Sequence, residues 1–167
     1  MALFTIALLI FVPMLIEAVR ARRNERAQQA RGGIEPQDDV YRIMRVLYPA
    51  SFLAMLAERA VAPVSSGATP VVVIGIVVFA AAKIIKWSAI VALGRSWTFR
   101  VIVVPGDALV VRGPYRYFRH PNYVGVIGEL VGGALMTRAL VTGPIAVIVF
   151  VVLLHKRIAV EGRALKI

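Results

Sequence analysis

The stretch Gly113-Pro114-Tyr115-Arg116-Tyr117-Phe118-Arg119-His120-Pro121-Asn122-Tyr123-Val124-Gly125 joins a polar segment to a long apolar run. It holds two prolines, three tyrosines and one of the two histidines in the chain. So many hydrogen-bonding groups at a membrane boundary are costly to desolvate unless they have partners. The stretch is therefore either an interfacial belt that anchors a helix or part of a binding site.

The apolar run after this stretch is one of five. The chain has 167 residues, is 59% hydrophobic and has a mean hydropathy of +0.78, whereas soluble domains are about half apolar. A helix that crosses a bilayer needs about 20 apolar residues. We predict an all-α, polytopic membrane protein that forms a single domain over residues 1–167, with about five transmembrane helices near residues 2–19, 43–63, 70–93, 121–137 and 139–154.

The basic residues predict the orientation. The net charge is +11, and five spans place 15 of the 20 Lys and Arg residues, in the first connector, the third connector and the C-terminal tail, on one side. The positive-inside rule makes that side cytoplasmic. We therefore predict an integral membrane protein, with its N-terminus outside and its C-terminus in the cytoplasm. Basic residues confined between apolar runs also argue against a nucleic-acid partner.

The composition excludes several kinds of site. The chain contains no cysteine, which rules out disulfides, thiolate metal sites and cysteine nucleophiles. Its two histidines, His120 and His155, have no metal-ligand spacing. We therefore expect no metal.

The polar connectors have distinct patterns. Residues 20–39 predict a helical extension followed by a loop, and Thr137-Arg138 predicts a tight hairpin between the last two helices. In the third connector, residues 99–104 and 108–112 flank the turn signal Pro105-Gly106-Asp107. We expect a short extended excursion there, on the cytoplasmic surface of the membrane.

The opening stretch places candidate binding residues at the start of the fourth helix. Pro121 suits a first helical turn, where its missing N–H costs nothing. Arg119 and His120 then lie at the helix N-terminus, whose free N–H groups favour an anion, and Tyr123 lies one turn further on. Gly125 leaves room for a ligand or for a neighbouring helix.

A second candidate pair lies in the last helix. Arg157 and Glu161 are four residues apart, so their side chains share one face. One interpretation is a surface ion pair of little energetic value. The other is a pocket shared with His120 and Tyr123, because five spans and a hairpin bring these segments together.

Acidic and basic residues also occur inside the apolar runs. Glu129 lies on a stripe of small and polar residues in the fourth helix, so it should face the other helices. A buried carboxylate can act as a base near neutrality, and the alternative is a structural hydrogen bond between helices. Lys83 and Lys86 are expected to extend toward the cytoplasmic surface, and Glu58-Arg59 is expected to form an interfacial pair.

The combined motifs resemble the isoprenylcysteine carboxyl methyltransferase family. They run in order as Leu93-Gly94-Arg95-Ser96-Trp97, Leu109-Val110-x-x-Gly113-Pro114-Tyr115-x-x-x-Arg119-His120-Pro121-x-Tyr123-x-Gly125 and Arg157-x-x-x-Glu161, within residues 93–165. In the N-terminal half, Glu17 and the run Arg22-Arg23-Asn24-Glu25 resemble a bacterial branch that methylates alkylresorcinol or alkylpyrone polyketides. One position departs from the family pattern, because Gly162 replaces a second glutamate.

The resemblance implies a helical membrane fold that binds S-adenosylmethionine in a cytoplasmic pocket. Carried onto this sequence, the implied cofactor-binding residues are Tyr115, Arg119, His120, Pro121, Tyr123, Gly125, Arg157 and Glu161. Arg119 is also a catalytic candidate. Trp97 would border the substrate entrance, and Glu129 would be the candidate base facing the acceptor.

These expectations favour a membrane O-methyltransferase that uses S-adenosyl-L-methionine and a lipophilic acceptor from the bilayer. The acceptor is a hydroxylated polyketide-type lipid or an isoprenylcysteine-like carboxylate. Two alternatives remain open. A phospholipid amine N-methyltransferase would share the cofactor. A small transporter or helper subunit would use the intramembrane glutamate and would not bind S-adenosylmethionine.

Overall fold

The fold is built from five long helices. The computed structural model describes residues 3–61 and 69–165, and these residues contain no β-strand. They form α1 (Leu3–Gln29), α2 (Tyr41–Val61), α3 (Thr69–Leu93), α4 (Pro121–Thr137) and α5 (Thr142–Leu165), with short 3-10 turns at η1 (Gly94–Ser96) and η2 (Gly113–Arg116). The predicted all-α architecture is confirmed.

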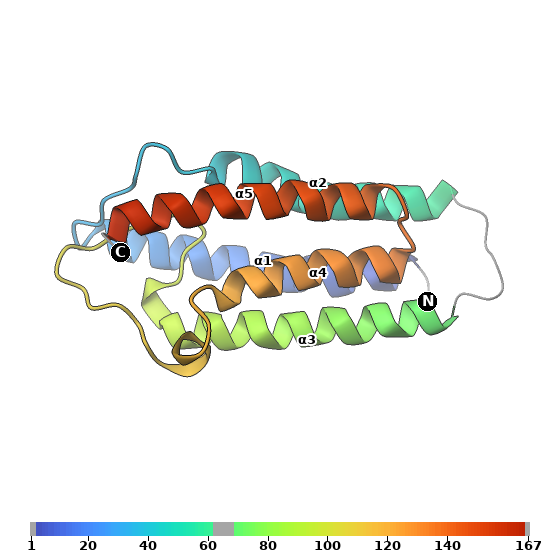
Figure 1. Ribbon diagram of the computed structural model, residues 1–167, viewed down its shortest axis with the longest axis horizontal. Helices are drawn as coiled ribbons and strands as arrows, with labels where there is room; N and C mark the ends of the chain where they lie inside the picture. The colour runs from blue at the N-terminus through green and yellow to red at the C-terminus, as the bar shows by residue number, and fades with distance from the viewer. Residues whose placement is uncertain (1–2, 62–68, 166–167) are drawn as a thin grey trace.

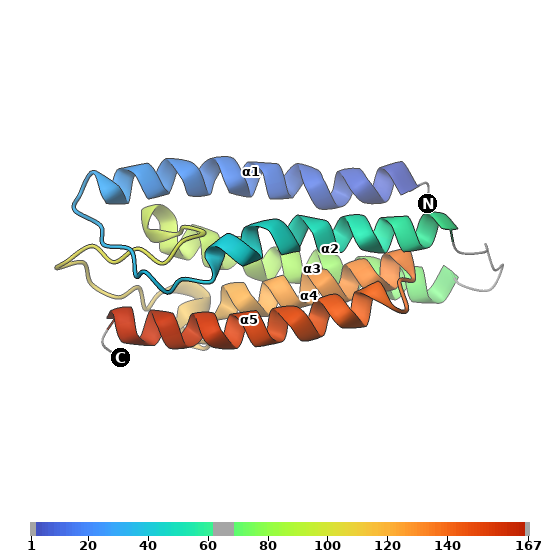
Figure 2. The same ribbon diagram turned by 90° about the horizontal axis from the view of Figure 1, so that it is seen from above.

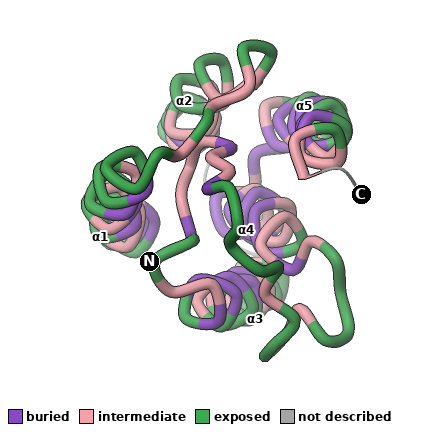
Figure 3. Tube along the Cα trace, turned by 90° about the vertical axis from the view of Figure 1, so that its left-hand side faces the viewer, coloured by how far each residue is buried: buried purple, intermediate pink, exposed green. Residues whose placement is uncertain are grey.

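Helix α4 lies at the centre of the bundle. The five helices run side by side (Figures 1 and 2), and the end-on view shows α4 surrounded by the other four (Figure 3). More than half of its 17 residues are buried. The helix that follows the motif stretch is therefore in contact with the rest of the molecule.

The long connectors and the short α4–α5 turn lie at opposite ends of the bundle. The α1–α2 connector, the α3–α4 connector and the C-terminal turns of α5 lie at one end, which we call the loop end (Figure 1). The first described residues of α1 and the α4–α5 turn lie at the other end. The basic connectors and the motif residues are thus gathered at the loop end.

Glycines allow α3 and α4 to pack closely. A Cβ atom on Gly132 would lie 2.6 Å from the backbone nitrogen of Phe79. A Cβ on Gly125 would lie 2.7 Å from the Cβ of Lys86. Small residues on an interface let helix backbones approach each other, and here they bring α4 against the lysine-bearing face of α3.

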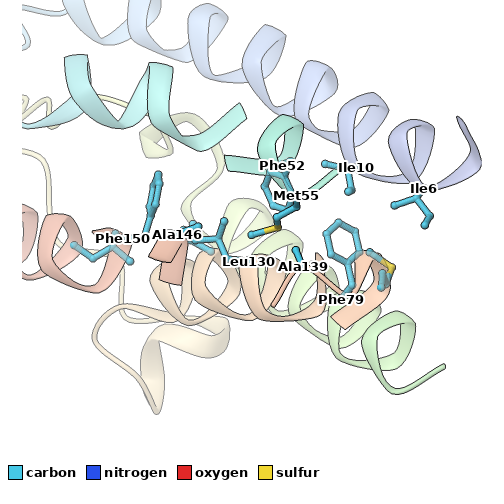
Figure 4. Close-up of a cluster of buried hydrophobic side chains, with 12 residues drawn as sticks. Ile6, Ile10, Phe52, Met55, Phe79, Leu130, Ala139, Ala146 and Phe150 are labelled. Atoms are coloured by element: carbon cyan, nitrogen blue, oxygen red, sulfur yellow. The ribbon is translucent and has the colours of Figure 1, made fainter. Parts of the chain in front are cut away.

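All five helices contribute to the main hydrophobic core. Figure 4 shows Ile10 from α1, Phe52 from α2, Phe79 from α3, Leu130 from α4 and Phe150 from α5 in one cluster. Each of these side chains is buried. This core holds the half of the bundle away from the loop end, and a second, smaller apolar cluster contains Ala21, Ile90 and Trp97.

Three of the helices are long and apolar enough to cross a membrane. They are α1, α5 and the segment Pro70–Ser96 that contains α3. Helix α4 has only 17 residues, and α2 carries several charged residues. The three apolar helices indicate an integral membrane protein, and the count of five spans stays a prediction.

The predicted hairpin between the last two helices has the expected form. Helix α4 ends at Thr137, and Arg138 adopts the left-handed conformation with φ of 56° before α5 begins at Thr142. The α3–α4 connector is extended, with one antiparallel bridge between Ile34 and Val103. The structure does not test on which side of a membrane this connector lies.

The expectation of an interfacial Glu58-Arg59 pair is wrong. The carboxylate of Glu58 accepts hydrogen bonds from the backbone nitrogens of Val141 and Thr142, at 3.0 and 2.8 Å, and from the Thr142 hydroxyl at 2.6 Å. It caps the first turn of α5, because the free N–H groups of a helix N-terminus attract an anion more specifically than an adjacent side chain does.

Candidate functional site

Arg157 is the centre of a hydrogen-bonded network at the loop end. It is buried, with 5% of its surface exposed. Its Nε donates to the Tyr123 hydroxyl at 2.8 Å, its Nη2 donates to the Phe99 carbonyl at 2.5 Å, and its Nη1 lies 3.4 Å from Asp39 Oδ1. One guanidinium thereby connects α5 to α4 and to both long connectors.

Glu161 completes this network from the next turn of α5. Its Oε1 accepts a hydrogen bond from the Tyr123 hydroxyl and lies 3.4 Å from Arg157 Nε. Its Oε2 lies 3.5 Å from Nδ1 of His120. The rings of His120 and Tyr123 are stacked, with centroids 5.3 Å apart and planes 7° apart.

We call His120, Tyr123, Arg157 and Glu161 the loop-end group. The spatial prediction for these four residues is confirmed, since the hairpin does bring α4 and α5 together. Their cofactor role stays a prediction.

Local sequence explains why the loop-end group forms. His120 is the N-cap of α4, and Pro121 occupies the first helical position. Asp39 was missed by the sequence analysis. Its carboxylate accepts hydrogen bonds from the backbone nitrogens of Tyr41 at 3.1 Å and Val101 at 3.0 Å. An Asp two residues before a helix is a recognisable capping signal, but its bond to Arg157 depends on the tertiary structure.

Arg119 and Tyr115 lie beside this group. Arg119 is exposed, and within residues 3–61 and 69–165 no carboxylate pairs with it. Tyr115 is half-buried, and its burial, reinforced by the charge of Glu161, raises the pKa of its phenol. Tyr115 therefore remains a neutral hydrogen-bonding group at physiological pH.

The C-terminal half of α1 fixes the segment that carries Trp97. Asn24 Nδ2 donates to the carbonyls of Gly94 at 3.0 Å and Trp97 at 2.7 Å. Gln28 Nε2 donates to the Arg95 carbonyl at 3.1 Å. Neither Asn24 nor Gln28 carried a predicted role of its own, although both lie on the buried stripe that also includes Glu17 and Ala21.

A second polar group, which we call the ion cluster, lies within the bundle. Lys83 Nζ lies 2.9 Å from Glu17 Oε1 and 3.1 Å from Glu129 Oε1. Lys86 Nζ lies 2.7 Å from Glu17 Oε2 and 3.2 Å from Glu129 Oε2. The Tyr48 hydroxyl donates to Glu129 Oε2 at 2.5 Å. These five residues come from α1, α2, α3 and α4.

The ion cluster corrects one expectation and confirms another. The prediction that Lys83 and Lys86 extend to the membrane surface is wrong, because carboxylates inside the bundle compensate their charges. The prediction that Glu129 faces the other helices is confirmed by its 1% exposure, and its bonds to α2 and α3 are those of the structural alternative. Its role as a base stays a prediction.

One cavity connects the loop-end group with the ion cluster. Its volume is about 1180 Å³. Its walls include Trp97, Tyr115, Arg119 and the whole loop-end group, together with Glu17, Tyr48 and Lys86 from the ion cluster. Apolar side chains also line the cavity, among them Phe11, Met14, Val126, Phe150 and Leu154.

Three predicted site residues lie away from this cavity. Among the described residues that line it, Pro121, Gly125 and Glu129 are absent. Gly125 packs against α3, as the glycine contact with Lys86 shows. Its small size therefore serves the approach of a neighbouring helix. In the described part of the chain, no three His, Cys, Asp or Glu side chains are grouped so that they can hold a metal ion.

The comparison with known families agrees with this geometry. The profile of the isoprenylcysteine carboxyl methyltransferase (ICMT) family matches residues 72–167, which include α4, α5 and both 3-10 turns. The chain belongs to the ICMT family. ICMT proteins are membrane methyltransferases that generally use S-adenosylmethionine, and the apolar helices of this chain agree with that class.

Three relatives cover different shares of the chain. The uncharacterized protein YpbQ of Bacillus subtilis (strain 168) is 32% identical over 96% of this chain and 94% of its own length. An uncharacterized protein of Haemophilus influenzae Rd is 26% identical over 86% of the chain and 83% of its own length. Protein-S-isoprenylcysteine O-methyltransferase A of Arabidopsis thaliana is 30% identical over 49% of the chain and 41% of its own length. No solved structure matches the chain.

Proposed function

We propose that this ICMT-family chain is an S-adenosylmethionine-dependent O-methyltransferase of the membrane, acting on a lipophilic acceptor. The observation that carries the proposal is the shared cavity. It joins a polar network at the loop end, built from the family motif, to apolar walls inside a bundle of membrane-type helices. Such a cavity suits a polar methyl donor and an apolar acceptor that must meet.

The residues at the loop end fit the chemistry of this cofactor. Arg119 has a guanidinium without a carboxylate partner among the described residues, and it lines the cavity, so it can bind the cofactor carboxylate. Glu161 offers carboxylate oxygens to hydroxyl groups, and the stacked faces of His120 and Tyr123 suit a cationic sulfur. Tyr115 adds a neutral phenol to the same wall.

The remaining residues orient these groups and exclude water. Arg157 holds Tyr123 and Glu161, and it is itself held by Asp39. Apolar side chains such as Phe11, Met14 and Phe150 keep the inner cavity dry. When bound, the cofactor supplies an electrophilic methyl group on a cationic sulfur. A dry site that aligns two reactants lowers the barrier mainly through orientation.

The position of Gly162 bears on the size of the site. Gly162 lines the cavity, where the family resemblance predicts a second glutamate. Glycine adds no carboxylate and leaves more space beside Glu161. We therefore assign the binding of hydroxyl groups to Glu161 alone.

The arrangement also supports a specific orientation. The basic connectors and the C-terminal turns of α5 are together at the loop end (Figure 1). We propose that this end is cytoplasmic, that five helices span the bacterial cell membrane and that residues 1–167 act as a single domain. The positive-inside rule is the physical basis of the orientation.

The test is direct binding followed by transfer. Calorimetry of the purified full chain with S-adenosylhomocysteine should show saturable binding. A labelled-methyl assay with a lipid extract should then give a product labelled on oxygen. Absence of binding would overturn the proposal and favour the transporter or helper class, and a label recovered on a lipid amine would favour N-methylation.

A further inference from the structure

The ion cluster has a feature that its structural role does not explain. Replacing a buried ion pair with well-packed apolar residues is often neutral or stabilising, and ionisable residues inside a membrane protein mark functional sites by default. This cluster places four charges from three helices in the bundle, with Glu17, Lys86 and Glu129 each no more than 2% exposed. Packing alone would be served as well by apolar side chains.

Lys86 is the lysine of the cluster that combines a spare donor with a place on the cavity wall. An ammonium has three N–H donors. Two are directed at Glu17 Oε2, at 2.7 Å, and Glu129 Oε2, at 3.2 Å. The Tyr48 ring lies beneath Nζ, at 5.2 Å from its centroid. One donor of Lys86 therefore remains, and Lys86 lines the cavity whereas Lys83 does not.

The two carboxylates of the ion cluster, in contrast, already face lysines. Both oxygens of Glu17 face a lysine, Oε1 at 2.9 Å from Lys83 and Oε2 at 2.7 Å from Lys86. Glu129 Oε2 accepts hydrogen bonds from the Tyr48 hydroxyl and from Lys86, and Oε1 lies 3.1 Å from Lys83 Nζ in an ion pair without a hydrogen bond. Carboxylates that already face ammonium groups have less to offer a further cation.

The charge of the cavity wall points the same way. Seven Lys and Arg side chains line the cavity, against three Asp and Glu side chains. Arg100, Arg157 and Arg163 pair with carboxylates that do not line the cavity. The cations that remain to act on a ligand are therefore Arg22, Arg45, Arg119 and Lys86. These groups repel a cationic head group and attract an anionic oxygen, more strongly in a dry site than in water.

We infer that Lys86 binds the acceptor through an anionic oxygen, so that Lys86 determines the specificity of the site for oxygen acids over amines. The inference rests on the proposed function. Glu129 lies six residues beyond Tyr123, roughly 9 Å along the α4 axis at 1.5 Å per residue. An acceptor oxygen bound at Lys86 would thus be separated from the loop-end group by about the length of one small head group.

The chemical step then needs no base inside the site. The acceptor enters ionised, and its proton stays in water. Its oxygen forms a bond to the methyl carbon while the bond from that carbon to sulfur breaks, leaving a neutral thioether. Lys86 keeps its proton throughout, and Glu129 holds Lys86 in place.

The test compares ligands of equal chain length with different head groups. Binding of palmitate, hexadecylamine and a long-chain alkylphenol is measured by calorimetry on the full chain in micelles. Palmitate should bind wild-type protein about 10-fold more tightly than hexadecylamine, as expected for a hydrogen bond to a charged group. Equal or tighter binding of the amine would overturn the inference, and this arm needs no variant.

Two matched variants then locate the effect. Lys86→Gln and Lys83→Gln each remove one ammonium from the same two carboxylates, but only Lys86 lines the cavity. Lys86→Gln should abolish the preference for palmitate, and Lys83→Gln should keep it. An equal loss in both variants would reduce Lys86 to a structural role.

Further readouts separate the acceptor classes and the two proposals. Methyl transfer to the alkylphenol but not to palmitate would identify the anionic oxygen as a phenolate, and the reverse would identify a carboxylate. S-adenosylhomocysteine affinity should be unchanged in both lysine variants. If neither the wild-type protein nor the two variants bind S-adenosylhomocysteine, the proposed function fails. The preference for palmitate over hexadecylamine is measured without the cofactor, so it tests the role of Lys86 separately.

Discussion

The loop-end group and the ion cluster are both networks of charged and tyrosine side chains, but they are built differently. The loop-end group uses residues close together in two neighbouring helices, with Arg157 and Glu161 on α5 and His120 and Tyr123 on α4. It also retains Arg119 as an exposed cation beside it. The ion cluster joins α1, α3 and α4 by four ion pairs, and Glu17, Lys86 and Glu129 are almost fully buried in it.

This difference suggests a division of labour. A network that keeps partly exposed groups can exchange its bonds with a ligand. A network buried inside the bundle loses more folding stability when one member is removed, because a charge is then left without a partner in a low-dielectric region. The loop-end group should therefore affect binding more than stability, and the ion cluster should affect both.

The largest expected effect is on the ion cluster. Glu129→Leu should lower the free energy of unfolding by about 3–5 kcal/mol, because it leaves the charges of Lys83 and Lys86 undercompensated. Glu161→Leu should cost less, since Glu161 is partly exposed and Arg157 keeps its bonds to Asp39 and Phe99. Denaturant titration in mixed micelles measures both.

A double variant provides the control for this prediction. Lys86→Met combined with Glu129→Leu removes one charge of each sign, so it should recover part of the stability lost in Glu129→Leu. Equal losses for Glu129→Leu and Glu161→Leu would contradict the proposed difference between the two groups.

The second effect concerns the glycine contact that places Lys86 against α4. Gly125→Ala should lower the free energy of unfolding by about 1–3 kcal/mol, because its Cβ would lie 2.7 Å from the Cβ of Lys86 and force α3 and α4 apart. The adjacent variant Val124→Ala is the control, since Val124 is 52% exposed. Thermal unfolding of the two variants side by side is the measurement, and a tolerated Gly125→Ala would count against close packing.

A third prediction concerns Arg119, the exposed cation beside the loop-end group. Arg119→Ala should weaken S-adenosylhomocysteine binding about 10-fold or more, the loss expected for a charged hydrogen bond to a carboxylate. Its stability should be unchanged, because Arg119 is exposed. The control is Arg116→Ala, which removes a nearby exposed arginine that does not line the cavity. Equal affinities in the two variants would exclude Arg119 from the binding site.

The smallest effect is a dependence on alkaline pH. Burial raises the pKa of Tyr115 in the folded state. Below the pKa of about 10 that tyrosine has in the unfolded chain, the Tyr115 phenol therefore keeps its proton in both states. Above it, the unfolded state loses this proton first, and stability falls as the pH rises. Tyr115→Phe should remove part of that fall, and Tyr117→Phe, at a position that is 79% exposed, should not. Thermal midpoints measured from neutral to alkaline pH decide between them.

Much of the fold could be predicted from local sequence. Five apolar runs predicted five helices, and the hairpin at Thr137-Arg138 predicted that α4 and α5 are neighbours. These features depend on the length and order of apolar segments, which fix the ends of helices and the topology of short connections. The pairing of Tyr123 with Arg157 and Glu161 follows from that topology.

Lys83 and Lys86 show where such reasoning stops. Near the end of an apolar helix, a lysine can extend to the membrane surface or pair with a carboxylate inside the bundle, and the local sequence is compatible with both. The choice depends on Glu17 in α1 and Glu129 in α4, which lie far away in the chain. Asp39 is similar, because its capping pattern does not reveal its bond to Arg157.

The sequence by itself determined that this chain is an all-α protein with membrane-type helices and the ICMT motif at the start of α4 and in α5. The lengths of the apolar runs, the short connections and the spacing of the motif residues are sufficient for that. Only the tertiary structure decided that four helices enclose the ion cluster, that Gly125 serves packing and that Lys86 reaches the cavity. Which side chains meet across helices depends on how each helix is rotated against its neighbours, and the pattern of a single helix does not contain that information.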